Sequence, residues 1–152
     1  MLDLSKQQLR GLIDKLSFFE FFTSEEKTII ADYKSNMKGY SAGDHIIRQG
    51  ETDQTVYLLL KGKAKITRKE KSAVSINTLK EGDVFGEIAF FSKRLRSTNV
   101  VALENAMVLK MDWTLFDELN ETIKNKIKDK LIEILIQRLE EMNKLLIKHS
   151  RR

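Results

Sequence analysis

The sequence predicts an α+β protein, in which an antiparallel, jelly-roll-like β-roll is flanked by short N-terminal helices and a long C-terminal helix. Short β-prone runs recur at intervals of about ten residues between positions 37 and 112. Six of the seven glycines lie between residues 39 and 86, where tight turns must join successive strands. The apolar residues follow a helical period at both ends of the chain. These three observations favour a roll between two helical segments.

Two short helices are predicted before the roll. The first covers residues 5–16, because Ser5 and Gln8 have the spacing of a capping box and apolar residues then recur at helical intervals. The second begins at Thr23, with Glu26 three residues later as its capping partner. Residues 18–22 between them contain four phenylalanines. We expect this cluster to anchor the helices to the core; a membrane dip or a partner site are the alternatives.

Six β-prone runs are predicted to form strands. Turn signals rich in Gly, Ser, Asp or charged residues separate them at 41–44, 49–53, 61–62, 68–72 and 81–83. The predicted strands are Ile46–Ile47, Val56–Leu60, Ala64–Thr67, Val74–Ile76, Val100–Leu103 and Met107–Met111.

After Asp112, a predicted N-cap, the helical period returns and lasts to about Lys148. Apolar residues step by three and four, as in a coiled-coil seam of about two heptads, at Ile132, Leu135, Leu139, Met142 and Leu146. Other apolar positions widen this stripe, so the helix can pack on its own roll, pair with a second copy, or do both. The chain therefore divides into N-terminal helices (1–36), a β-roll (37–112), C-terminal helices (113–148) and a basic tail (149–152), all within one domain.

Composition excludes several classes of protein. The chain has no cysteine, hence no disulfide framework, thiolate metal site or cysteine nucleophile. A metal-dependent jelly-roll enzyme needs two or three converging histidines, whereas this chain has only His45 and His149. No apolar run approaches the ~20 residues that span a bilayer, and the N-terminus lacks the features of a signal peptide. We expect a cytoplasmic protein that is not an enzyme and has no membrane span.

The net charge of +5 is concentrated near the C-terminus. Residues 121–152 carry nine basic and five acidic side chains. Lysines alternate there with acids, as on a solvated helix face, and no aromatic residue is available for base stacking. We therefore expect no nucleic acid among the partners of this chain.

The densest chemical signal lies between Gly82 and Val100. Gly86 precedes Glu87 and a short apolar stretch, and Arg96 follows nine residues after the acid. A glycine before a short helical turn can aim several backbone N–H groups at one anion, and an arginine can bind two phosphate oxygens. A carboxylate beside a phosphate site is suited to accept a hydrogen bond from another group of the ligand, such as a sugar hydroxyl. The spacing predicts a ligand with one phosphate and a neighbouring hydroxyl; the alternative is a surface hairpin with a structural Glu87–Arg96 salt bridge.

With the turns that precede it, this segment resembles the cyclic nucleotide-binding domain of kinase regulatory subunits, nucleotide-gated channels and catabolite activators. The resemblance covers about residues 18–148. It includes Gly43–Glu51, Val56–Lys63 and Gly82–Glu87, and a phosphate-binding cassette over 85–98 in which eight residues separate the acid from the arginine. It implies a regulatory, allosteric module that takes part in signal transduction, binds cAMP or cGMP as its ligand and has no cofactor.

The resemblance also implies the roles of the cassette residues. Glu87 accepts a hydrogen bond from the ribose 2′-hydroxyl, and Arg96 pairs with the exocyclic oxygens of the cyclic phosphate. The backbone N–H groups of Gly86, Ile88 and Ala89 complete the anion cradle.

The end of the cassette departs from the family pattern. Ser97 stands where the family has a small or hydroxylated residue, and it leaves the choice between cAMP and cGMP open, with a slight preference for cAMP. Thr98 replaces a usual alanine next to the phosphate and is the change most relevant to affinity. Leu95 and Asn99 also depart from the pattern, and we expect them to alter only the stiffness of the loop.

Members of the family cover the base with the C-terminal helix, which implies Gln137, Arg138 and Met142 as candidates for a base lid. Arg138 also has the spacing for ion pairs with Glu133 or Glu141. The signal is expected to leave through movement of this helix, toward a second copy or an effector protein. The alternative is a degenerate roll that has lost its ligand and serves only in protein interaction or dimerisation.

Overall fold

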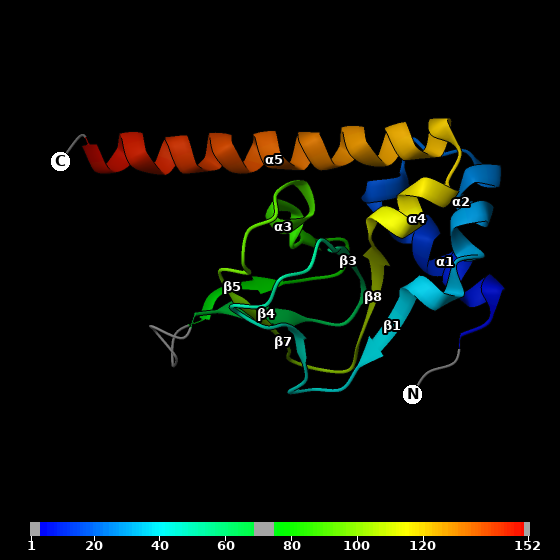
Figure 1. Cartoon of the computed structure of the whole chain (residues 1–152), viewed down its shortest axis with the longest axis horizontal. Coiled ribbons are helices and arrows are strands. Elements are labelled where there is room, and N and C mark those ends of the chain that lie inside the picture. Colours follow the sequence, from blue (N-terminus) through cyan, green and yellow to red (C-terminus); the bar gives the residue numbers. More distant parts are fainter. Residues whose placement is uncertain (1–3, 69–74, 151–152) are drawn as a thin grey trace. The chain divides into compact units, whose positions relative to one another are not determined.

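The computed structural model describes residues 4–68 and 75–150. Helices, strands and helices follow one another in the predicted order (Figure 1). One compact unit ends at Glu118 and a second begins at Leu119. No helix within the described ranges combines the length and the apolar character needed to cross a membrane.

The helices of the first unit are short. They are α1 (Lys6–Lys15), η1 (Ser17–Phe19), α2 (Ser24–Ala31), η2 (Lys34–Asn36), α3 (Glu87–Phe91) and α4 (Trp113–Glu118). Both predicted capping boxes are confirmed. The Ser5 hydroxyl accepts from the Gln8 N–H at 3.2 Å while the Gln8 side chain accepts from the Ser5 N–H at 2.8 Å. Thr23 and Glu26 repeat this exchange at 3.1 and 2.8 Å, so each helix begins where its local sequence predicts.

The phenylalanine cluster is confirmed at three of its four positions. Phe18, Phe19 and Phe22 are buried, with ring centroids 4.9 Å apart for the first two and 5.2 Å apart for the last two. Phe21 is 75 % exposed, so the prediction that it joins the core is wrong. It follows η1 at a turn, where Glu20 and Phe21 are both exposed and Phe22 returns to the core.

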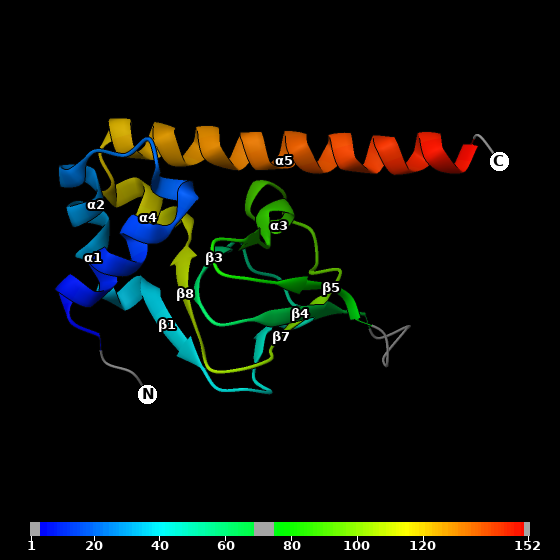
Figure 2. The same cartoon turned by 180° about the vertical axis from the view of Figure 1, so that it is seen from behind.

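Eight strands form the β-roll: β1 (Met37–Tyr40), β2 (His45–Ile47), β3 (Val56–Lys61), β4 (Ala64–Thr67), β5 (Ser75–Leu79), β6 (Val84–Phe85), β7 (Asn99–Ala102) and β8 (Ala106–Met111). They make two antiparallel four-stranded sheets, ordered β1-β8-β3-β6 and β2-β7-β4-β5. Figure 2 labels β1, β8 and β3 of the first sheet and β7, β4 and β5 of the second. The predicted runs match six of them. Sequence patterning missed β1, whose four residues include Lys38 and Gly39, and β6, which has only two residues. The start of the predicted strand at Val74 and most of the predicted turn at 68–72 lie outside the described residues.

The core of the roll lies between the inner faces of the two sheets. Alternate residues of most strands supply it, since successive side chains of a strand point to opposite faces. β2 supplies two consecutive residues, because its register with β7 is irregular. Its members are Ile46, Ile47, Tyr57, Leu59, Ala64, Leu79, Phe85, Val100, Ala102, Ala106 and Val108. The intervening residues of β3 are also buried, because the strand contacts α1 and α3 as well as the roll. This explains why β3 is a continuous apolar run.

The predicted N-cap Asp112 is confirmed by its carboxylate, which accepts from the Leu115 N–H at 2.9 Å. The helical region after it is divided in two, because Asn120 begins a new helix by accepting from the Ile123 N–H at 2.9 Å. This second helix, α5 (Glu121–Ser150), is 30 residues long and belongs to the second unit. Its exposed large apolar side chains are Ile132, Ile136, Leu139, Met142, Leu145, Leu146 and Ile147.

Candidate functional site

The predicted cassette begins where the short strand β6 leads into α3. Phe85 pairs with Tyr57 of β3, and their rings stack with centroids 5.2 Å apart. Gly86 follows in a left-handed conformation with φ +79° and caps the short helix α3. The predicted glycine and helical turn are therefore present. Glu87 opens that helix and is buried, with 7 % of its surface exposed.

Gly86 also makes room for the arginine of the cassette. A Cβ atom at this position would lie 2.8 Å from Nη1 of Arg96 and 3.3 Å from the Thr55 carbonyl oxygen. Any side chain would displace the guanidinium, in addition to straining the positive φ angle. A glycine is needed here to let the Arg96 guanidinium approach the backbone, as well as to form the turn.

Arg96 is almost completely buried, at 5 % exposure, and its guanidinium is held from three directions. Nη1 donates to the carbonyl of Gly86 at 2.9 Å, and Nη2 donates to the carbonyl of Thr55. Nε and Nη2 together donate to the two carboxylate oxygens of Asp53, with Nε at 3.2 Å. Such a two-point arginine–carboxylate pair fixes the orientation of the guanidinium plane.

The backbone of Arg96 is fixed as firmly as its side chain. Its N–H donates to the carbonyl of Glu51 at 2.9 Å, and its carbonyl accepts from the N–H of Gly50 at 2.8 Å. Three residues later, the Asn99 side chain accepts from the N–H of Gln49 at 2.8 Å. Asn99, the first residue of β7, thus contacts the segment after β2 directly, and its contribution is more specific than the loop stiffness expected from the sequence.

Asp53 is the site residue that sequence reasoning missed; the sequence offers an acid partner for Arg96 only in the alternative of a structural salt bridge, and that partner is Glu87. Burial raises the pKa of the Asp53 carboxyl, but the hydrogen bonds and charge of Arg96, the Thr55 N–H and the charge of Lys110 more than offset this and hold the pKa below its usual value. Asp53 is therefore ionised at neutral pH and cancels the formal charge of Arg96. Its position, three residues before a buried strand, is the one sequence signal that marks it.

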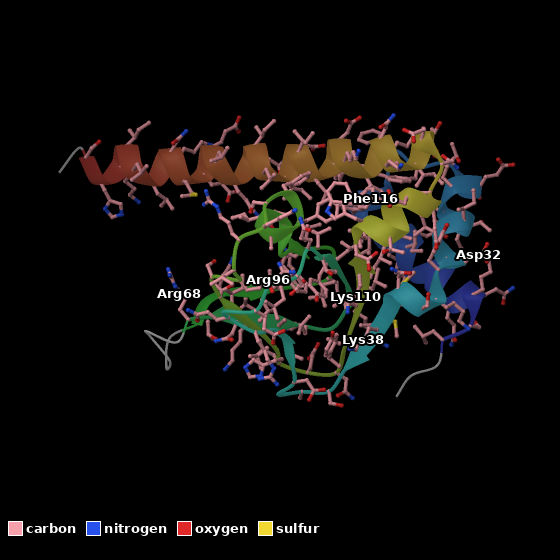
Figure 3. All side chains as sticks on the ribbon, in the orientation of Figure 1. Asp32, Lys38, Arg68, Arg96, Lys110 and Phe116 are labelled. Atoms are coloured by element: carbon pink, nitrogen blue, oxygen red, sulfur yellow. The ribbon has the colours of Figure 1, made fainter. Side chains whose placement is uncertain are left out.

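Tyr57 forms an aromatic surface beside the ion pair. The Arg96 Cζ atom lies 5.8 Å from the centroid of its ring, within the range of a cation–π contact. Burial, and next the negative charge of Asp53, raise the pKa of the Tyr57 phenol, which stays neutral across the physiological range. Figure 3 labels Arg96 within the β-roll.

A surface pocket of about 250 Å³ lies beside the pair and is lined by Thr52, Asp53, Gln54, Lys93 and Arg94. Of the predicted site residues, Gly86 and Arg96 are in direct contact and Glu87 follows Gly86 in the chain. Ile88 is exposed and Ala89 is buried, whereas Ser97 is exposed and Thr98 half-buried. The base-lid candidates Gln137, Arg138 and Met142 lie on α5 in the second unit and stay a prediction. Within residues 4–68 and 75–150, no three His, Asp or Glu side chains are grouped to hold a metal ion.

The family model of the cyclic nucleotide-binding domain matches residues 37–122, which include both sheets and the whole cassette. The chain belongs to the cyclic nucleotide-binding domain family. Its fold is that of a regulatory domain, and relatives that carry such a domain include protein kinases.

Known proteins agree with this assignment. The chain is 35 % identical to human (Homo sapiens) cGMP-dependent protein kinase 2 over 102 residues, which are 65 % of this chain and 13 % of the kinase. The Thermus thermophilus catabolite activator protein superposes with a TM-score of 0.72 at 25 % identity, covering 88 % of this chain and 62 % of that one. The structure of PfPKA-R with cAMP bound has a TM-score of 0.68 at 24 % identity, covering 95 % of this chain and 47 % of that one.

Proposed function

We propose that this domain is a regulatory module that binds cAMP or cGMP through its cassette. The observation that carries the proposal is the orientation of Arg96. An arginine has five N–H donors, and four of them are directed to Asp53, Thr55 and Gly86. The remaining Nη1 hydrogen has no acceptor within the described ranges of the chain. A preoriented guanidinium with one donor left over is suited to an incoming phosphate oxygen.

The other cassette residues supply the rest of the ligand site. Glu87, buried at the start of α3, accepts the ribose 2′-hydroxyl, and the backbone N–H groups of Gly86, Ile88 and Ala89 surround the cyclic phosphate. Ser97 and Thr98 contribute hydroxyl groups beside the phosphate and the purine. Ser97 leaves the choice between the two nucleotides open, with a slight preference for cAMP.

The known proteins that resemble this chain support different nucleotides. The human relative is named a cGMP-dependent kinase, whereas the superposed PfPKA-R structure holds cAMP. Ser97 slightly favours cAMP in our reading of the cassette. We take cAMP as the first ligand and cGMP as its competitor.

The signal is proposed to leave through α5. A helix of 30 residues with this many exposed apolar side chains needs a surface to bury them, which bound nucleotide, a second copy or an effector can provide. A helix that docks only when nucleotide is present would exchange its amide hydrogens more slowly in the complex. Hydrogen exchange over residues 131–147, with and without nucleotide, tests this; equal protection in both states rules the lid out.

The same ion pair supports a second candidate function. Because Asp53 already neutralises Arg96, the cluster is also a stable structural pair that needs no ligand. A roll of this kind would act only in protein interaction or dimerisation. The two candidates differ in whether nucleotide binds at all.

Calorimetric titration of the purified chain with cAMP and cGMP separates them, with 5′-AMP as the control for the cyclic phosphate. A ligand at about 100 times its Kd stabilises the native state by roughly 2.7 kcal/mol. Arg96→Ala is expected to weaken binding about tenfold to a few hundredfold, because bonds to charged groups contribute about 1.5–3 kcal/mol. Glu87→Ala, which removes a bond to a neutral hydroxyl, is expected to weaken it less. No heat and no shift in Tm with either nucleotide would favour the interaction module.

A further inference from the structure

Lys110 points into the roll from β8. It is the cross-strand partner of Tyr57 on β3, and directly paired residues present their side chains on the same face of a sheet. Two and four residues earlier on the same strand, Val108 and Ala106 belong to the core of the roll. The two-residue period of the strand therefore places the half-buried Lys110 on the inner face as well.

Lys110 and Arg96 share one aromatic ring. The Lys110 Nζ atom lies 5.9 Å from the centroid of the Tyr57 ring, and the Arg96 Cζ atom lies 5.8 Å from the same centroid. Both distances fall within the range of cation–π attraction. Figure 3 labels both side chains on neighbouring parts of the roll. Tyr57 thus connects the buried arginine with a second cation from another strand.

The second cation changes the charge of the site. Arg96 and Asp53 form a pair with no net formal charge, so their attraction for an anion is limited to dipoles and short-range hydrogen bonds. Lys110 is close enough to Asp53 to help lower the pKa of its carboxyl, after Arg96 and Thr55. Arg96, Asp53 and Lys110 together carry one net positive charge, which opposes the negative charge that a bound cyclic phosphate brings to the site.

We propose that Lys110 is a positioning residue of the nucleotide site, which holds Asp53 in its pair with Arg96 and restores the positive charge that Asp53 removes. This inference rests on the proposed function. Lys110 acts through Asp53 and through its field across Tyr57, without touching the ligand. Removal of its charge weakens binding of an anionic nucleotide and leaves the fold in place.

Lys38 offers a matched control. Its Nζ atom lies 5.3 Å from the centroid of the Tyr40 ring, so it makes the same type of cation–π contact on the neighbouring strand β1. Lys38 is exposed, and the charges that lower the pKa of Asp53 most are those of Arg96 and Lys110. Replacing Lys38 by methionine lowers the net charge of the chain by one, as the same change at Lys110 does, but it removes the charge beside Tyr40 instead of Tyr57.

The experiment compares Lys110→Met, Lys110→Arg and Lys38→Met with the parent chain, by calorimetric titration with cAMP and cGMP at low and high salt. We expect Lys110→Met to raise Kd about three- to tenfold at low salt, and less at high salt, where charge interactions are screened. Lys110→Arg and Lys38→Met should bind as the parent does. Equal binding by Lys110→Met and the parent, equal losses in both methionine variants, or failure of arginine to restore binding would each overturn the proposal.

A second measurement keeps this result separate from the proposed function. The pKa of the Asp53 carboxyl, followed by carbon NMR during an acid titration, should be higher in Lys110→Met than in the parent and unchanged in Lys38→Met. If that change is observed while the parent binds neither nucleotide, the role of Lys110 toward Asp53 holds and its role in binding fails with the proposed function. If the parent binds nucleotide but neither Kd nor the pKa responds to Lys110→Met, only the present inference fails.

Discussion

The N-terminal helices and the cassette each contain a buried glutamate in the first turn of a short helix, yet the two regions are built differently. Glu26 is 8 % exposed and closes a capping box with Thr23, only three residues away. The cassette depends instead on Asp53 and Thr55, which lie 43 and 41 residues from Arg96 in the chain. Local contacts form wherever the local sequence occurs, whereas the cassette needs the finished roll to bring its groups together. Mutations in the N-terminal helices should therefore change the stability of the domain by small amounts, and mutations in the cassette by larger amounts.

Gly86→Ala should have the largest effect on stability. The residue would keep a left-handed conformation that costs about 1–2 kcal/mol for a residue with a Cβ, and its methyl group would meet Arg96 Nη1 at 2.8 Å. The overlap with the buried guanidinium adds to this strain, so we expect a total loss of about 2–3 kcal/mol. Urea denaturation of the free chain measures it. A loss of a few tenths of a kcal/mol would mean that the cassette has room to rearrange.

Asp53→Asn is expected to destabilise the free domain by about 1–2 kcal/mol at neutral pH. Breaking a buried pair costs about 3–5 kcal/mol, but the Asp53 side chain is 38 % exposed, and solvent reduces the loss. The pKa of Asp53 is lowered in the folded state, so its contribution is complete above the unfolded pKa and disappears as pH falls through the folded pKa. The difference between variant and parent should therefore shrink in acid. A difference that does not change with pH would show that the charge of Asp53 is not what stabilises the pair.

Thr23→Ala tests the local region. The hydroxyl of Thr23 accepts from the Glu26 N–H at 3.1 Å, and loss of an N-cap costs about 1 kcal/mol. We expect thermal denaturation to report this loss, with Thr23→Ser restoring the stability of the parent. Nucleotide affinity should be unchanged, because the cap contributes no group to the cassette. A change in affinity would indicate that the two regions are coupled.

Gly11→Ala should have the smallest effect, and the opposite sign. Gly11 lies inside α1, and a Cβ atom there would meet nothing within 4 Å. Alanine is favoured over glycine within a helix by about 0.5–1 kcal/mol, so this variant should be slightly more stable than the parent. The same substitution thus stabilises one region and disrupts the other. Destabilisation by Gly11→Ala in urea would contradict the view that α1 follows local propensity.

The sequence by itself determined the elements whose causes lie within a few residues. Ser5 with Gln8, Thr23 with Glu26, and Asp112 at the start of α4 are caps that use neighbouring donors, and all three are where the pattern predicts them. Six of the eight strands were also predictable, because each combines β-prone residues with a turn signal. Local patterns did not reveal that Phe21 faces solvent or that Asn120 starts a new helix, since each depends on how the chain turns at one residue.

Only the tertiary structure decided the partners of Arg96. The spacing of Gly86, Glu87 and Arg96 identifies a cassette, but it suggests Glu87 as the acid nearest to the guanidinium. The pairing of β3 with β6 places Thr55 and Asp53 there instead, and the pairing of β3 with β8 places Lys110 across Tyr57. Strand register joins residues that are distant in the chain, and each side chain reaches its partner only after two sheets have closed on their core. For this reason the type of site could be predicted from spacing, whereas its charge balance could not.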